Sequence, residues 1–316
     1  MKAVLCKSFG PPETLVVEDV ADPIPGAGEV VLSVKAAGVN FPDVLMIENK
    51  YQVKPPLPFS PGGEAAGVVS GIGPGVDGVK PGDRVMAITG HGALAEQVVV
   101  SADRLVAIPA AMDDLAAGAF LFTYATSDHA VRDRGELRAG ETMLVLGAAG
   151  GVGLAAVEIG KAAGATVIAC ASSDEKLDVC RAHGADATIN YNTEDLREGI
   201  KRITADRGVD VVIDPVGGTA MADNVRSLRP RGTIVNFGLS GGAEATIAHL
   251  YPFFRNELRI VGSWMGSMAE LREGLALVRQ GRIKPALDRV LPLSAAQEAH
   301  RLVGEARVVG KLALVP

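Results

Sequence analysis

The sequence is poor in cysteine, in aromatic residues and in excess positive charge. Its three cysteines, Cys6, Cys170 and Cys180, are too few and too scattered for a disulfide framework or a closed zinc site, so we expect reduced, buried thiols. Aromatic residues make up 4% of the chain and the formal net charge is −6. Such a composition supplies neither stacking platforms nor a basic surface, which argues against nucleic-acid binding.

Long apolar runs are also missing. No stretch approaches the roughly 20 apolar residues that cross a bilayer, and the first residues, MKAVLCKSFGPPETL, lack the long apolar core of a signal peptide. We therefore expect a cytoplasmic protein with no membrane partner. With 316 residues, 48% of them hydrophobic, the chain is long enough for two domains and a large core.

The most informative segment that is present is MLVLGAAGGVGLAAVEIGKAAGATVIACASSDEK, residues 143–176. An apolar strand, 143–146, runs into a glycine-rich turn and then into a helix that we expect to begin near Val152. Ala148 occupies the first place of the G-x-G-x-x-G fingerprint, and Gly150 and Gly153 fill the other two. The backbone N–H groups of such a helix start bind a pyrophosphate, so the segment predicts dinucleotide binding rather than a structural turn.

The end of the second strand, Thr166–Ala171, bears on the choice between NADH and NADPH. An NAD-selective site places an acidic residue there, roughly 20 residues past the glycines, but this chain has Ala171, Ser172 and Ser173, followed by Lys176. Hydroxyl groups and an ammonium favour a 2′-phosphate, and hence NADPH. The alternative is that Asp174, Glu175 and Lys176 are only the solvated first turn of the next helix.

The pattern of strands and helices changes twice along the chain. Up to about Asp114, short β-rich runs broken by Pro and Gly predict a mostly antiparallel β domain, with strands at Glu29–Val39, 65–69, Arg84–Ile88 and 94–100. From about Leu115, strands at 143–146, Thr166–Ala171, Ala187–Asn190, 209–213 and 233–237 alternate with helices, which predicts a doubly wound parallel sheet. The remainder, with a strand at 258–262, helices at 268–280 and 294–305 and a strand at Lys311–Val315, is expected to return to the first domain.

Four segments together resemble the zinc-independent medium-chain dehydrogenases/reductases of the NADPH:quinone oxidoreductase group. They are GVNFPDVLMIENKYQVKPPLPFSPGGEAAGVV (38–69), LFTYATSDHAVRDRGELRAGETMLVLGAAGGVG (121–153), VDVVIDPVGG (209–218) and the final GKLALVP. The resemblance implies an α/β fold with a mostly β GroES-like catalytic domain (1–114 and 257–316) and a Rossmann domain (115–256). It also implies an active site in the cleft between them.

The zinc-dependent relatives provide a comparison for metal chemistry. Where they carry a cysteine after Gly-Val and a histidine before Glu, this chain has Asn40 and Gly63. The five histidines, His91, His129, His183, His249 and His300, show no metal-binding spacing. We therefore expect no metal. Without a Lewis acid, the favoured hydride acceptor is an already electrophilic quinone or α,β-unsaturated carbonyl.

Candidate groups for this chemistry lie in the first domain. By similarity, Asn40 lies near the nicotinamide and ribose, and Tyr51 borders the substrate and can donate a hydrogen bond or a proton; Asp43 is a further candidate. The alternative interpretation makes Asn40 a turn residue, Asp43 a helix-start carboxylate and Tyr51 an ordinary amphipathic surface ring.

The resemblance implies further cofactor contacts in the second domain. Besides Asn40, they are Thr123 toward the nicotinamide, Ala149, Gly150, Gly151 and Val152 at the pyrophosphate, Ser172, Lys176 and Tyr191 at the 2′-phosphate, and Phe237, Leu239 and Trp264 toward the nicotinamide end. For Phe237 and Trp264, core packing is the alternative.

Two other functions stay open. One is reduction of an enoyl-CoA, acryloyl-CoA or 2-haloacrylate alkene, because the same hydride chemistry serves any activated alkene. The other is non-catalytic NADPH binding. The family also implies a homodimer, for which the apolar strand at 258–262 offers an edge that can pair with its twin.

Overall fold

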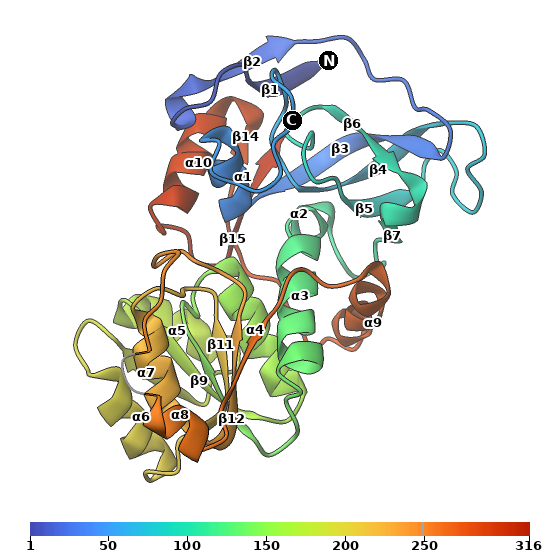
Figure 1. Cartoon of the computed structure of the whole chain (residues 1–316). Coiled ribbons are helices and arrows are strands. Elements are labelled where there is room, and N and C mark those ends of the chain that lie inside the picture. The colour runs from blue at the N-terminus through green and yellow to red at the C-terminus, as the bar shows by residue number, and fades with distance from the viewer. Residues whose placement is uncertain (248–249) are drawn as a thin grey trace. The chain divides into compact units, whose positions relative to one another are not determined.

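The computed structural model describes residues 1–247 and 250–316 (Figure 1). Its backbone forms two compact units, Met1–Phe122 together with Pro285–Pro316, and Thr123–Lys284. We refer to them as the first and the second unit and describe each by itself.

The first unit is built mainly of antiparallel strands. Its elements are β1 (Lys2–Cys6), η1 (Pro12–Thr14), β2 (Leu15–Asp19), β3 (Glu29–Val39), α1 (Phe41–Ile47), β4 (Glu64–Ile72), β5 (Arg84–Ile88), β6 (Gln97–Ser101), η2 (Ala102–Arg104), β7 (Leu105–Ala107), α2 (Asp114–Gly118), β14 (Leu287–Pro292), η4 (Leu293–Ala295), α10 (Ala296–Gly304) and β15 (Lys311–Val315). Seven strands form one sheet in the order β14-β15-β3-β4-β5-β7, with β6 also paired to β3, and β1 and β2 form a hairpin. Only the β14–β15 pairing in this sheet is parallel among the described pairs.

The long strand β3 organises the first unit. It pairs with β4, β6 and β15, and its mostly buried run EVVLSVKAAGV ends at Val39, directly before Asn40. Its neighbours β4 and β15 begin at Glu64 and Lys311, and the antiparallel pairing puts both starts at the end of β3. Sheet pairing therefore brings polar residues from distant parts of the sequence to one place.

The second unit has an entirely parallel sheet in the order β10-β9-β8-β11-β12-β13. Its elements are α3 (Leu121–Asp128, which crosses the junction between the units), η3 (His129–Arg134), β8 (Thr142–Val145), α4 (Gly151–Ala162), β9 (Thr166–Ala171), α5 (Asp174–Ala182), β10 (Ala187–Asn190), α6 (Leu196–Thr204), β11 (Val209–Asp214), α7 (Ala220–Ser227), β12 (Leu228–Asn236), α8 (Tyr251–Arg255), β13 (Arg259–Gly262) and α9 (Met268–Arg279). Every residue of β8 and β11 is buried, as expected for strands covered on both faces. The strand order is that of the doubly wound Rossmann fold, so the predicted fold class is confirmed.

The boundaries of the two units differ from the expected domain boundaries. The segment 257–284, which the sequence placed with the β domain, lies in the second unit because β13 extends the parallel sheet by pairing with β12. Only the later elements β14, α10 and β15 return to the first unit. The helix expected near Val152 begins one residue earlier, at Gly151, and β12 begins at Leu228 rather than at 233.

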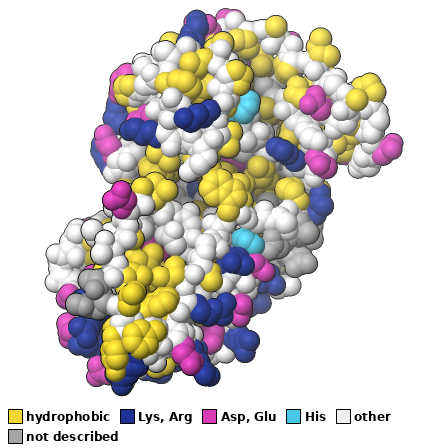
Figure 2. Space-filling model, viewed as in Figure 1, with side chains coloured by type: hydrophobic (Ala, Val, Ile, Leu, Met, Phe, Trp, Pro, Cys, Tyr) yellow, Lys and Arg dark blue, Asp and Glu magenta, His cyan; other side chains and the backbone are white. Residues whose placement is uncertain are grey.

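Apolar side chains gather on one face of the second unit, over α8 (Figure 2). Leu250, Tyr251 and Phe254 are exposed there, and Ile260 of the edge strand β13 is exposed as well. None of the described helices combines the length and the low charge that crossing a bilayer requires.

Candidate functional site

The turn between β8 and α4 is shaped by two glycines. Gly147 has φ +54°, a conformation that favours glycine. A Cβ on Gly153 would lie 2.6 Å from the Ala148 Cα and would also collide with the Gly147 carbonyl oxygen, so only glycine lets the helix start pack against the turn. The turn thus has the close helix–strand packing of a dinucleotide-binding loop.

The amino end of α4 offers an anion site. Gly150 is the N-cap and the helix runs for 12 residues from Gly151. The N–H groups of its first turn have no carbonyl partner within the helix and lie at the positive end of its dipole. The residues predicted to bind the pyrophosphate, Ala149, Gly150, Gly151 and Val152, all lie at this end.

Two of the three residues predicted for the 2′-phosphate are in direct contact at the end of β9. The Lys176 ammonium donates to the Ser172 hydroxyl across 3.2 Å, and Ser173, the N-cap of α5, accepts from the Lys176 backbone N–H. Tyr191 follows the neighbouring strand β10, its backbone N–H donates to the Ala171 carbonyl, and its side chain is exposed. Lys176 does lie in the first turn of α5, but its side chain turns back toward the end of the strand.

The ends of β11 and β12 form a second cluster of turns. The buried Asp214 carboxylate accepts from the backbone N–H groups of Val216 and Gly217, both at 2.8 Å, and thereby holds the DPVGG turn. Phe237 follows β12 and is partly buried. Leu239 is 47% exposed and Trp264 is 61% exposed, so core packing does not explain the tryptophan.

Helix α3 carries Thr123, which is buried. The same helix is joined to the glycine-rich turn region by Ser127, whose hydroxyl donates to the Val152 carbonyl across 2.7 Å. The position of Thr123 is thus coupled to the start of α4.

In the first unit, Asn40 and Asp43 occupy the start of α1. Asn40 is the N-cap residue, and the Asp43 carboxylate accepts from the backbone N–H groups of Asn40 at 2.8 Å and Gly62 at 3.2 Å. Burial raises the pKa of Asp43 to about 6, although these two hydrogen bonds and the Lys311 charge act in the opposite direction. Asp43 is therefore a helix-start carboxylate, as the alternative interpretation held, with an altered proton affinity.

The sequence reasoning missed two residues of this cluster, Glu64 and Lys311. Glu64 is 1% exposed and Lys311 is 6% exposed, and they form an ion pair of 2.9 Å. Lys311 also donates to Asn40 Oδ1 at 2.5 Å, and Asn40 Nδ2 donates to Glu64 Oε1 at 3.0 Å. The signal was a charged residue next to each of two apolar strands, in PGGEAAG and GKLALVP.

Tyr51 lies just beyond α1 and packs against the core of the first unit. Its side chain is half-buried, which fits both a residue that borders a substrate and an amphipathic surface ring. Desolvation raises the pKa of Tyr51, and the charge of Asp43 adds to the rise.

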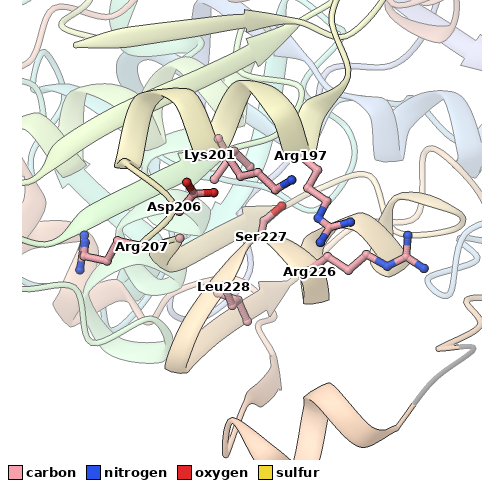
Figure 3. A pocket seen from close by; sticks show the side chains of 9 residues that line it. Arg197, Lys201, Asp206, Arg207, Arg226, Ser227 and Leu228 are labelled. Atoms are coloured by element: carbon pink, nitrogen blue, oxygen red, sulfur yellow. The ribbon is translucent and has the colours of Figure 1, made fainter.

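A cavity of about 260 Å³ lies at the amino ends of β11 and β12, the ends of these strands opposite to those that carry the turns described above (Figure 3). Its charged lining residues are Arg197, Lys201, Asp206, Arg207 and Arg226. Lys201 and Arg226 belong to the last turns of α6 and α7, where cations offset the negative ends of the helix dipoles. Arg207 forms an ion pair with Asp210 at 2.8 Å. None of the predicted cofactor residues lines this cavity.

Metal-ligating side chains are scattered over the described part of the chain. Among the residues whose side chains the structure describes, no three His, Cys, Asp or Glu residues are grouped so that they could hold an ion. His249 lies outside the described residues.

Comparison with known proteins agrees with the two-unit description. Residues 26–110 match the family model "Alcohol dehydrogenase GroES-like domain", and residues 151–280 match "Zinc-binding dehydrogenase". The human protein named synaptic vesicle membrane protein VAT-1 homolog is 34% identical over 94% of this chain and 81% of its own length.

Two solved structures are similar over the full length of both chains. One is an NAD-dependent alcohol dehydrogenase, with 35% identity and a TM-score of 0.94. The other is Escherichia coli quinone oxidoreductase complexed with NADPH, with 32% identity and a TM-score of 0.92. The chain belongs to the medium-chain dehydrogenase/reductase family of oxidoreductases.

Proposed function

We propose that this protein is an NADPH-dependent reductase that transfers a hydride to a quinone or another activated α,β-unsaturated carbonyl without a metal. The observation that carries the proposal is the Ser172–Lys176 pair at the end of β9, next to a glycine turn that fits a pyrophosphate. The similarity to a quinone oxidoreductase complexed with NADPH supports it.

The residues of the second unit fit the cofactor. Gly153 leaves room where a Cβ would collide with the turn, and the first N–H groups of α4 face the region where a pyrophosphate would lie. Ser172, Lys176 and Tyr191 would hold the 2′-phosphate; Thr123, Phe237, Leu239 and Trp264 would hold the nicotinamide end. When bound, NADPH supplies the hydride, and the protein supplies alignment.

In the first unit, the proposed catalytic residues are Asn40, Tyr51 and Asp43. Tyr51 carries a phenolic proton, with a pKa raised above the ordinary value of 10, and can donate a hydrogen bond to the developing enolate or quinolate. The Lys311 ammonium bonded to Asn40 Oδ1 places a positive charge where zinc-dependent relatives have a metal ligand, and so opposes a dication there. The metal-free mechanism is proposed on that chemistry.

The test is steady-state oxidation of NADPH and of NADH, side by side, with quinones, simple enones and enoyl-CoA esters. We expect turnover of a quinone or an enone, with NADPH preferred. Preference for the CoA ester would assign the alkene-reductase function instead, and tight NADPH binding without turnover of any acceptor would contradict the reductase.

The cofactor choice has its own variant. Lys176→Ala removes the ammonium beside Ser172, so the Kd for NADPH should rise about tenfold, the loss of one charge-assisted contact, while that for NADH changes little. Lys7→Ala, which removes a surface ion pair with Glu18 in the first unit, serves as the matched control. An equal rise in the Kd for NADPH and for NADH would show that Lys176 does not contact the 2′-phosphate.

We also propose that two copies associate through the edge strand β13. The described sheet ends at this strand, which pairs only with β12, and the exposed apolar side chains over α8 lie in the same unit. An open edge next to an apolar surface favours pairing with a second copy.

A further inference from the structure

The side-chain amide of Asn40 is held between two buried opposite charges. Its oxygen Oδ1 accepts from the Lys311 ammonium at 2.5 Å, and its nitrogen Nδ2 donates to Glu64 Oε1 at 3.0 Å. Asn40 is 6% exposed, and its two partners are buried as well. Asn40 directly follows β3, and its two partners are the first residues of β4 and β15, so the sheet fixes their spacing.

The chemistry of these partners determines which way the amide faces. An ammonium only donates and a carboxylate only accepts, so exchange of the amide oxygen and nitrogen would set donor against donor and acceptor against acceptor. The second Nδ2 hydrogen is directed toward the Gly38 carbonyl at 3.4 Å. Both amide hydrogens therefore point into the protein, and a lone pair of Oδ1 is what the amide has left for a ligand.

The partners are engaged within the protein as well. Lys311 Nζ donates to the Val39 carbonyl and to Asn40 Oδ1, at 3.2 and 2.5 Å, and forms an ion pair with Glu64 Oε1 at 2.9 Å. The second Glu64 oxygen accepts from the Phe122 backbone N–H at 2.9 Å, one residue before Thr123. One carboxylate thus links the Asn40 amide to the helix that carries Thr123.

We infer that Asn40 acts as a hydrogen-bond acceptor toward a hydroxyl or N–H group of the bound dinucleotide, and that Glu64 and Lys311 are positioning residues that hold it in this role. The inference rests on the proposed function. It leaves the stabilisation of the developing oxyanion to another donor, and Tyr51 is the candidate with a phenolic proton. The buried Glu64–Lys311 ion pair, which is costly to desolvate, serves to orient the Asn40 amide rather than to stabilise the fold.

A charge relocation tests the role of the amide. Asn40→Asp alone sets a carboxylate against Glu64, so kcat/KM should fall, and the Kd for NADPH rise, at least tenfold. In the double variant Asn40→Asp/Glu64→Gln, the new amide at position 64 donates to the new carboxylate at position 40 while its oxygen accepts from Phe122, and Lys311 keeps a carboxylate partner. Because the carboxylate at position 40 can still accept, both quantities should return to within about threefold of wild type.

The opposite outcome overturns the inference. A carboxylate cannot donate, so if Asn40 served its ligand as a donor, the double variant would stay as impaired as Asn40→Asp. Glu64→Gln alone should raise the Kd for NADPH in protein that is fully folded by circular dichroism; a lower Tm with an unchanged Kd would reduce Glu64 to a structural role. Glu13→Gln, which removes an exposed ion pair with Arg301, is the matched control.

A second measurement needs neither turnover nor a folded variant. In wild-type protein labelled with 15N-asparagine, both Asn40 Nδ2 hydrogens should exchange slowly with solvent, because both are bonded inward. Rapid exchange of one of them would reveal an outward donor and contradict the inference. If no acceptor is reduced but the exchange and Kd results are as expected, the reductase proposal fails while the acceptor role of Asn40 stands.

Discussion

Tyr124 donates its phenolic hydrogen to Glu158 across 2.5 Å, and both side chains are buried in the second unit. The other Glu158 oxygen lies 2.7 Å from His183 Nδ1 and accepts from the Lys284 backbone N–H at 3.2 Å. Burial and the neighbouring carboxylate raise the Tyr124 pKa well above its ordinary value. One carboxylate therefore joins α3, α4, the end of α5 and the last residue of the unit.

Removal of the Tyr124 hydroxyl should loosen this junction. We expect Tyr124→Phe to lower the free energy of unfolding by about 2 kcal/mol, since it takes a donor from a buried carboxylate. Urea unfolding at pH 7.5 measures the loss. Tyr251→Phe removes an exposed hydroxyl from the same unit and should change little. Equal effects of the two substitutions would show that the bond to Glu158 contributes no net stability.

His300 should make the protein less stable in acid. Burial lowers its pKa from 6.5 to about 4, while Nδ1 donates to the Ala296 carbonyl at 2.7 Å. The folded state holds the ring neutral. The contribution of His300 to the free energy of unfolding is therefore fully present above the unfolded pKa and falls, by about 3 kcal/mol, as the pH drops from 6.5 to 4. In His300→Leu this contribution should vanish, so the stability of the variant at pH 4.5, compared with pH 7.5, should be higher than in the wild type. Unfolding midpoints at pH 7.5 and 4.5 test it, and an unaltered pH slope in the variant would contradict the assignment.

Asp43 has the opposite dependence. Its folded pKa is raised from 3.8 to about 6, so its contribution is complete below pH 3.8 and is lost as the pH rises through 6. In the wild type, the terms from Asp43 and His300 largely offset each other between pH 4 and 6. Asp43→Asn should expose the His300 term as a steeper loss of stability in acid, measured by the same unfolding series. A slope like that of the wild type would indicate an ordinary pKa for Asp43.

Gly153 should not tolerate a side chain. The added methyl of Gly153→Ala meets the Gly147 carbonyl oxygen and the Ala148 backbone, so the helix must move away from the turn. We expect the Kd for NADPH to rise more than tenfold and the Tm to fall, by fluorescence titration and calorimetry. Gly71→Ala, where the new Cβ makes only ordinary contacts, is the control. Undiminished NADPH binding by Gly153→Ala would place the pyrophosphate elsewhere.

The edge strand β13 should support self-association. A lysine at Ile260 puts a charge on the exposed side of the strand, and light scattering at micromolar concentration should then report a monomer where the wild type is a dimer. Ile24→Lys, at an exposed position of the first unit, should leave the dimer intact. A monomeric wild type would refute the association itself.

Local sequence patterns predicted the second unit well. The apolar run Thr166–Ala171 became a strand with those bounds, because an interior parallel strand is buried on both faces and leaves little ambiguity. The partly buried edge strand Ala187–Asn190 also has the predicted bounds. The glycine turn could be predicted for a similar reason, since Gly147 and Gly153 are required by the conformation and close packing of backbone only a few residues away. The contact between Ser172 and Lys176 is also local, four residues apart on one helix start.

The polar cluster around Asn40 could not be derived in this way. Glu64 and Lys311 meet only because β4 and β15 both pair with β3. Pairing between strands so far apart in the sequence cannot be predicted from local composition. The same limit applies to β13, whose short apolar run fits either unit until its pairing with β12 is known. Contacts set by topology, unlike turns and helix starts, needed the structure.

The place of β15 in its sheet has a consequence for biosynthesis. This strand, at Lys311–Val315, lies between β14 and β3, so the first unit receives an interior strand from the far end of the chain. The second unit is continuous in sequence and has all its strands once Lys284 has been translated. During synthesis the Rossmann unit can therefore fold first, while the sheet of the β unit lacks the neighbour of β3 until Lys311–Val315 has left the ribosome.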